Sequence, residues 1–432
     1  MSGIQFGIDR LLASPELVTG RVGLVTNDAA RTARDSELHS RVALQLAGRN
    51  LVRLFSPEHG IAASAADGAA VADGVDPFTG LPVVSLYGEH MRPPRESLGD
   101  LDAVLFDIPD IGARFYTYIW TLAHVLEACA EAGVPLIVLD RPNPLSGDLA
   151  AAEGPMLDVE KFSSFIGRAA IPIRHSLTVG ELAQLWNAEW NLNAKLEVIR
   201  CEGWQRAMHW PDTGLPFVQT SPAIASYEAA LLYPGLCLFE ATNLSVGRGT
   251  PLAFQAVSAP WLNTVEIAAR FNALALNQTA SSPHPSPPFR MEERVAAGRE
   301  RRRSEIPRQK AQTEIGQGLP PTGVLARPEN PNQLNSAATV RLVVNDPKVF
   351  RPVAAGLLLL ATVLELHRDH FQWAKYPTAA NPGGEGHFER LIGRTGTREA
   401  LERGVVEVHP LVAGWTEAVG WPRRVKPFLL YD

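Results

Sequence analysis

Runs of valine, leucine and isoleucine without polar alternation recur through the first 145 residues. They predict strands at Arg21–Thr26, Leu51–Phe55, Val83–Tyr87, Ala103–Ile108 and Pro135–Leu139. Between them, Glu37–Ala47 and Tyr118–Ala132 have the pattern of helices. Strands that are apolar on both faces, alternating with helices, are typical of a parallel sheet covered on both sides. We therefore expect an α/β fold with a Rossmann-like, doubly wound parallel sheet.

The pattern changes after about residue 150, and a chain of 432 residues is long enough for more than one domain. A strand at Thr339–Val344 followed by an apolar helix at Val353–His367 predicts a smaller C-terminal α+β domain. The expected segments are a Rossmann-like domain carrying the catalytic loops (1–150, extending at most to about 275), a cleft-forming segment (151–275), a Pro/Arg-rich linker or insertion (276–335) and the C-terminal domain (336–432).

Composition narrows the class of protein. The net charge is −6, and the basic run Arg299–Arg303 is most simply a solvated linker, so we expect neither nucleic acid nor a membrane as a partner. Three widely spaced cysteines indicate neither a disulfide framework nor a structural metal. The opening MSGIQFGIDRLL lacks the pattern of a signal peptide, which predicts a cytoplasmic protein unless the true start lies upstream. The oligomeric state is left open.

Familiar catalytic and cofactor motifs are absent from the sequence. The chain has no GxGxxG after its first strand, no Walker A loop, no GxSxG and no HExxH. Dinucleotide binding, ATP hydrolysis and ordinary serine hydrolase chemistry are therefore disfavoured, and no cofactor is expected. The remaining candidates are carboxylates, histidines and arginines on loops.

Three polar clusters directly follow predicted strands, namely Ser56–Gly60, Pro109–Arg114 and Asp140–Pro144. Parallel strands end at one edge of a sheet, and open α/β sheets bind ligands beyond that edge. The three clusters together therefore predict a reactive site there.

Glu58 is the first candidate in this region. Pro57 restricts the entry to its loop, Gly60 permits a sharp turn, and His59 can tune a neighbouring carboxyl group. A glutamate partly removed from water has a raised pKa, which suits a general acid. The alternative is an ordinary loop glutamate facing solvent.

Glu153 is the second candidate carboxylate, because a pair of carboxyl groups is the usual equipment for glycoside hydrolysis. A turn glutamate is the competing interpretation. Asp107, Asp110 and Arg114 are expected to form either an ion-pair brace or part of the site.

Other candidates also have two interpretations. Tyr116 flanks a ligand or packs in the core, and Arg248, between two glycines, binds an anion or braces its loop. His59 and His175, with Asp107 or Asp140, offer metal-ligand atoms, but their spacing follows no familiar metal motif, so no metal is predicted.

At these same residues the sequence resembles the YbbC-type exo-β-N-acetylmuramidases, long described as a domain of unknown function. The resemblance covers nearly the whole chain except about 276–335. It is carried by the motifs Gly23–Asn27, Ser56–Gly60, Thr79–Val83, Ser85–Gly88, Phe106–Tyr118, Asp140–Pro144, Glu153–Pro155, Pro172–His175, Tyr233–Gly235 and Glu240–Thr250.

The resemblance implies a Rossmann-like domain joined to a smaller one, with the active site between them. It implies release of N-acetylmuramic acid from the non-reducing end of peptidoglycan fragments such as MurNAc-GlcNAc. Glu58 matches the proposed catalytic glutamate, and Glu153 falls on a second acidic position. Arg141, Arg248 and His175 would bind the lactyl carboxylate. The predicted substrate-binding set is His59, Asp107, Arg114, Tyr116, Arg141, Asn143, His175, Glu240, Asn243 and Arg248.

Two alternatives stay open at this point. Ala62 and Ala223 stand where the family commonly has polar residues, which favours a non-catalytic protein that binds sugars or muropeptides. A metal-dependent hydrolase is the other alternative.

Overall fold

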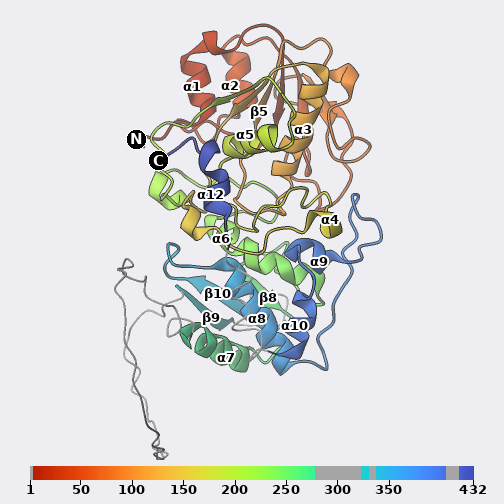
Figure 1. Ribbon diagram of the computed structural model, residues 1–432, viewed down its shortest axis with the longest axis vertical. Helices are drawn as coiled ribbons and strands as arrows, with labels where there is room; N and C mark the ends of the chain where they lie inside the picture. Colours follow the sequence, from red (N-terminus) through yellow and green to blue (C-terminus); the bar gives the residue numbers. More distant parts are fainter. Residues whose placement is uncertain (1–2, 278–322, 330–336, 405–417) are drawn as a thin grey trace, which may run out of the picture.

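The computed structural model describes residues 3–277, 323–329, 337–404 and 418–432. Figure 1 shows two parts stacked along the long axis of the molecule, with both ends of the chain on the larger part. We call described residues 3–226 and 418–432 the sheet domain, and described residues 227–404 the small domain. No helix among the described residues is long and apolar enough to cross a membrane.

The sheet domain is built on seven strands in the order β3-β4-β2-β1-β5-β6-β7. Every pairing is parallel except that between β3 and β4. The predicted doubly wound α/β fold is thereby confirmed. The strands are β1 (Val22–Thr26), β2 (Leu51–Ser56), β3 (Gly74–Val75), β4 (Pro82–Ser85), β5 (Ala103–Asp107), β6 (Leu136–Leu139) and β7 (Leu196–Ile199).

Helices cover both faces of this sheet. Neighbouring residues of one strand point to opposite faces, so Leu24 packs with the cluster that includes α1 (Gly7–Ala13) and α2 (Ser40–Leu46). Val25 packs instead with the cluster containing α3 (Tyr118–Ala132) and α5 (Val179–Glu189). Burial on both faces explains why the strand sequences lack polar alternation.

The order of the strands reverses direction beside β1, which makes this position a topological switch point. From β1 the chain builds outward through β2 and β4, and then crosses to β5 on the other side. Loops leaving the carboxyl ends of β2 and β5 consequently diverge around a crevice, which is the usual ligand position in open α/β sheets.

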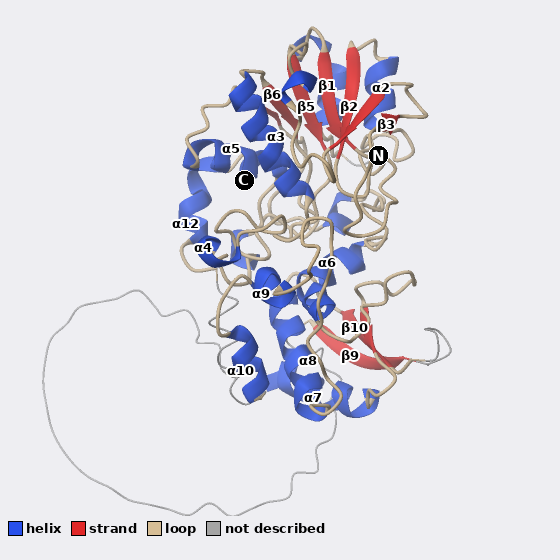
Figure 2. Cartoon of the chain, turned by 90° about the vertical axis from the view of Figure 1, so that its right-hand side faces the viewer, coloured by secondary structure: helices blue, strands red, loops and turns tan. Residues whose placement is uncertain are grey.

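The small domain contains a three-stranded antiparallel sheet in the order β8-β10-β9. Its helix α8 packs against α6 and α7, and Figure 2 shows these helices beside β9 and β10. Gly235 and Gly356 let α6 and α8 approach closely, since a Cβ on Gly356 would lie 2.4 Å from the Gly235 carbonyl oxygen. The elements are α6 (Tyr227–Leu236), β8 (Ala256–Ser258), α7 (Thr264–Asn277), β9 (Val324–Glu329), β10 (Thr339–Val344), α8 (Pro352–Leu366), α9 (His387–Ile392) and α10 (Thr397–Arg403).

Two strands of the small-domain sheet lie in segments that we did not assign to the C-terminal domain from the sequence. We expected a linker through 276–335, but Val324–Glu329 forms β9, with Val324 and Ala326 buried. Pro328 obscured the strand in the sequence, although proline is tolerated at the edge position that β9 occupies. The rest of the expected linker, apart from 276, 277 and 323, lies outside the described residues. Strand β8 also precedes the expected start of the C-terminal domain.

The end of the chain returns to the sheet domain. The Tyr431 hydroxyl donates to Asp140 Oδ2 at 2.6 Å, and the Leu430 amide donates to Glu181. The last residues therefore close over the sheet domain rather than the small domain. The short helices are α4 (Val159–Phe162), α12 (Trp421–Val425) and the 3-10 turns Pro15–Leu17, Arg95–Ser97, Leu149–Ala151, Trp210–Thr213, Cys237–Ala241 and Lys426–Phe428.

Candidate active site

Glu58 lies in the loop that follows β2, and its side chain is buried. The next two residues, His59 and Gly60, have positive φ angles of 67° and 74°. Such a conformation is uncommon for a non-glycine residue and often marks a functional loop. It turns the chain sharply, so that the following loop folds back over Glu58.

Three groups hold the Glu58 carboxyl group. Gly68 donates its backbone N–H to Oε1 at 2.9 Å, and Thr117 donates its hydroxyl to Oε2 at 2.6 Å. The Tyr87 side chain is a further hydrogen-bond partner, and burial together with the negative charge of Glu58 raises the pKa of its phenol. Glu58 is therefore fixed by the loops after β2 and β5 and by a residue just beyond β4.

A pocket opens beside Glu58, between the sheet domain and the small domain. Its wall combines carboxylates, hydroxyls and aromatic rings. The polar and aromatic lining residues are Glu58, His59, Asp67, Tyr87, Phe115, Tyr116, Thr117, Phe165, Ser221, Tyr233, Glu240, Phe254, Tyr376, Thr378 and His387.

A charged cluster crosses the pocket from one domain to the other. Arg248 contacts Asp67 with Nη2 at 3.2 Å and Glu240 with Nε at 2.6 Å. The Tyr376 hydroxyl donates to Asp67 and lies 3.3 Å from Glu240. Burial raises the pKa of Glu240, against the opposing effect of Arg248. Two carboxylates thus share one guanidinium and one phenol.

His387, at the start of α9, forms another part of the wall. Its ring stacks on Tyr376 with centroids 4.5 Å apart and an interplanar angle of 16°. Burial lowers the pKa of His387 to about 4, so its imidazole is neutral at pH 7. A neutral stacked ring supports Tyr376 without adding charge to the site.

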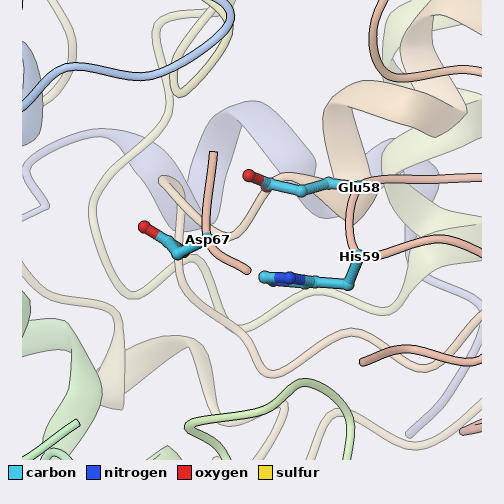
Figure 3. A group of neighbouring side chains, drawn as sticks. All are labelled: Glu58, His59 and Asp67. Atoms are coloured by element: carbon cyan, nitrogen blue, oxygen red, sulfur yellow. The ribbon is translucent and has the colours of Figure 1, made fainter. Parts of the chain in front are cut away.

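Glu58, His59 and Asp67 also have the geometry of a possible metal site. One ligand atom from each lies within 4.8 Å of the others, and Figure 3 shows the Glu58 and His59 side chains extending toward Asp67. The His59 Nδ1 donates to the Ala65 carbonyl oxygen at 2.8 Å, so Nε2 is the ring nitrogen left to bind an ion.

Four of the predicted site residues line this pocket, namely Glu58, His59, Tyr116 and Glu240. Arg248 reaches its edge through the ion pairs with Asp67 and Glu240. Tyr116 also donates its hydroxyl to Thr220 at 2.8 Å, so it both packs and faces the pocket.

Glu153 does not face this pocket. It is buried, and its two carboxylate oxygens accept the backbone N–H groups of Val353 and Ala354 at 3.1 and 2.7 Å. These are the first amides of α8, where a carboxylate is favoured by the helix dipole. The expectation that Glu153 and Glu58 share one cleft is therefore wrong, because a helix from the small domain occupies both oxygens of Glu153.

Arg114 is likewise a link between the domains. It is fully buried and donates to the carbonyls of Leu391 and Ile392 at the end of α9, as well as to Pro155 and Ile171. Burial lowers its pKa to about 9. The expected brace of Arg114 with Asp107 and Asp110 is not formed, because these carbonyls occupy the guanidinium.

The other predicted residues are engaged elsewhere. Asp107 forms a two-point ion pair with Arg141, with N–O distances of 2.6 and 3.0 Å. His175 donates from Nε2 to Asp110 at 3.1 Å. Asn143 bonds backbone groups of Leu145 and Leu177, and Asn243 bonds those of His370 and Gln372. None of Asp107, Arg141, Asn143, His175 and Asn243 lines the pocket beside Glu58.

Sequence reasoning missed Asp67, Thr117, Tyr376 and His387. Thr117 stood next to the quoted tyrosines, so its position before α3 was available as a signal. Asp67 lies in a segment rich in alanine without a regular pattern, and Tyr376 is 309 residues away from it. No local pattern relates residues at that separation.

The fold and site define a two-domain α/β protein with a pocket of carboxylates, hydroxyls and aromatic rings beside its sheet. Family models described as the N-terminal and C-terminal parts of exo-beta-N-acetylmuramidase NamZ match residues 22–228 and 231–431. The chain belongs to this family. The resemblance predicted from the sequence is thereby confirmed.

Individual relatives agree with this assignment. The chain is 35% identical to the peptidoglycan beta-N-acetylmuramidase NamZ of Bacillus subtilis (strain 168), over 99% of this chain and 91% of the relative. Two crystal structures of DUF1343 family proteins from Bacteroides fragilis match with TM-scores of 0.77 and 0.65, at 27% and 25% identity. Both matches cover the whole of this chain and at least 99% of the relative.

Proposed function

We propose that this protein is an exo-acting glycoside hydrolase that releases N-acetylmuramic acid from the non-reducing end of peptidoglycan fragments such as MurNAc-GlcNAc. Family membership and the Bacillus subtilis relative support the reaction class. The observation that carries the proposal is Glu58, buried at the pocket wall and held by donors from three loops.

Glu58 is suited to act as the general acid. Its Oε1 faces the Gly68 N–H, which can only donate, whereas its Oε2 faces the Thr117 hydroxyl, which can donate or accept. A proton on Oε2 is therefore accommodated by rotation of one hydroxyl. In the reaction this proton passes to the glycosidic oxygen as its bond to the muramyl ring breaks.

The lactyl carboxylate of the sugar requires a cation. Arg141 and His175 are committed to Asp107 and Asp110 away from the pocket. Of the predicted set, Arg248 remains, since its side chain is 30% exposed beside the pocket. We assign the lactyl contact to the N–H groups of Arg248 that face away from Glu240.

A chromogenic MurNAc glycoside tests the proposal. The wild type should hydrolyse it, and Glu58→Gln should lower kcat roughly 10²–10⁴-fold while substrate still binds. Glu197→Gln, a change of the same type at an exposed site on β7, is the matched control and should keep full activity. Binding without turnover in the wild type would instead indicate a non-catalytic sugar-binding protein.

The Glu58–His59–Asp67 group supports a second candidate, a metal-dependent hydrolase. In that case these residues would hold the ion, and chelation would abolish activity. Loss of turnover after chelator treatment, restored by Zn²⁺ or Mn²⁺, selects this candidate, whereas unchanged turnover selects acid catalysis by Glu58. The cytoplasmic location and the absence of nucleic-acid and membrane partners remain predictions.

A further inference from the structure

Asp67 is a second carboxylate in the wall of the pocket beside Glu58. It directly precedes Gly68, whose N–H donates to Glu58 Oε1 and whose carbonyl accepts from the Ala379 amide at 2.7 Å. One peptide segment consequently sets the positions of both carboxyl groups. Figure 3 shows the Glu58 and Asp67 side chains near each other.

The surroundings of the two carboxyl groups differ in charge. Asp67 contacts Arg248 at 3.2 Å and accepts the Tyr376 hydroxyl, both from the small domain. These partners place a cation and a hydroxyl donor beside Asp67. Within the described part of the chain, no arginine or lysine hydrogen-bonds Glu58, whose partners there are the Gly68 amide and the hydroxyls of Thr117 and Tyr87. Two carboxyl groups with such different neighbours are suited to different roles in a reaction.

Their separation indicates how the reaction proceeds. A carboxylate oxygen of Asp67 lies within 4.8 Å of one of Glu58. Glycosidases that retain anomeric configuration hold their two carboxyl groups close together, whereas inverting enzymes hold them farther apart to admit a water molecule. The closeness of Asp67 to Glu58 therefore favours the retaining arrangement.

Building on the proposed hydrolase activity, we propose that Asp67 is the catalytic nucleophile and that hydrolysis retains the β configuration. In the first step Glu58 gives its proton to the glycosidic oxygen, the bond from C1 to that oxygen breaks, and Asp67 forms a bond to C1. In the second step Glu58 takes a proton from water, the water oxygen bonds to C1, and the Asp67–C1 bond breaks. One water molecule is consumed, and no oxidant or reductant is needed.

Product stereochemistry and azide rescue test this assignment with a chromogenic β-MurNAc glycoside. The wild type should release β-MurNAc first, as followed by NMR before mutarotation. Asp67→Ala should lower kcat roughly 10³-fold or more. With azide, Asp67→Ala should form the α-glycosyl azide, and Glu58→Ala should form the β-glycosyl azide. A residue that only supports the loop would give no azide adduct when mutated.

Asp73→Ala is the matched control, because Asp73 lies in the same loop, contacts the Ser85 amide and does not line the pocket. It should keep wild-type turnover. Three results would each overturn the inference while leaving the hydrolase function intact. They are first release of α-MurNAc, near-normal turnover of Asp67→Ala, and an Asp67→Ala protein that keeps its thermal midpoint but forms no azide adduct. A wild type that binds the glycoside without turnover would reject the hydrolase function itself, and the nucleophile with it.

Discussion

Thr117 donates its hydroxyl to Oε2 of Glu58 at 2.6 Å, although the two residues follow different strands of the sheet. Thr117 immediately precedes α3, so this contact ties the position of the carboxyl group to a long, buried helix. Glu58, the proposed general acid, is thereby positioned by the fold and not by its own loop alone.

Replacement of Thr117 by valine should impair catalysis more than stability. Valine has nearly the same shape but cannot hydrogen-bond, and a hydrogen bond to a charged group contributes about 1.5–3 kcal/mol. We expect kcat for the MurNAc glycoside to fall roughly 10–100-fold, with KM nearly unchanged. Thr121→Val, in the first turn of α3, is the control, because the Thr121 hydroxyl donates to the Thr117 carbonyl and not to Glu58. Equal loss of kcat in both variants would contradict the assigned role.

Glu153→Gln should impair stability more than catalysis. Glutamine can offer only one carbonyl oxygen to the two amides at the start of α8, and its NH₂ group would face a donor. We expect the free energy of unfolding to drop by about 1–3 kcal/mol, measured by urea denaturation, while kcat of the folded enzyme stays within about twofold of wild type. A large loss of kcat at unchanged stability would return Glu153 to the catalytic set.

The contrast between Glu58 and Glu153 shows what the sequence can predict. Apolar runs located the central strands, and α3 begins and ends at the predicted residues. Glu58 was predicted because its loop directly follows a strand at the binding edge of the sheet, and in the structure it lines a pocket. Glu153 has an equally suggestive sequence context, but its partners are 200 and 201 residues away on α8.

Charged residues at the sheet edge were over-assigned for a related reason. Asp107 and Arg141 have the residue types of a ligand site, yet they satisfy each other. A buried charge requires a partner whether or not it binds a ligand. Residue type and strand position therefore do not separate the two roles, and only the three-dimensional pairing does.

The stability of the protein should fall with acidity partly through His387. Burial lowers its pKa to about 4 in the folded protein, whereas an unfolded histidine has a pKa near 6.5. Between these values the unfolded chain binds more protons, so stability that is complete above pH 6.5 is lost as the pH falls toward 4. His387→Phe should reduce the loss in free energy of unfolding between pH 7 and pH 4 by up to roughly 3 kcal/mol. Denaturant unfolding at a series of pH values measures this loss.

His209 is the control that separates the effect on stability from an effect on substrate binding. Burial lowers its pKa to about 4 as well, but His209 does not line the pocket. His209→Phe should reduce the same loss in free energy of unfolding and leave KM for the MurNAc glycoside unchanged. His387→Phe should also change KM, because its ring supports Tyr376 at the pocket wall. If both variants had wild-type KM, His387 would have no part in the site.

Tyr376→Phe should reveal how far the small domain contributes to the chemistry. The Tyr376 hydroxyl donates a hydrogen bond to Asp67, although the two residues are 309 positions apart in the chain. Without the hydroxyl, Arg248 alone holds Asp67, and the aspartate becomes freer to rotate away from C1. Misplacement of a reacting group by about 1 Å can cost roughly 10²-fold, so we expect kcat to fall about 10–100-fold with little change in thermal midpoint. Tyr431→Phe is the matched control, since its hydroxyl also donates to a buried aspartate, Asp140, away from the pocket. That variant should lose stability and keep kcat, and a reversal of the two profiles would mean that Tyr376 serves only to join the domains.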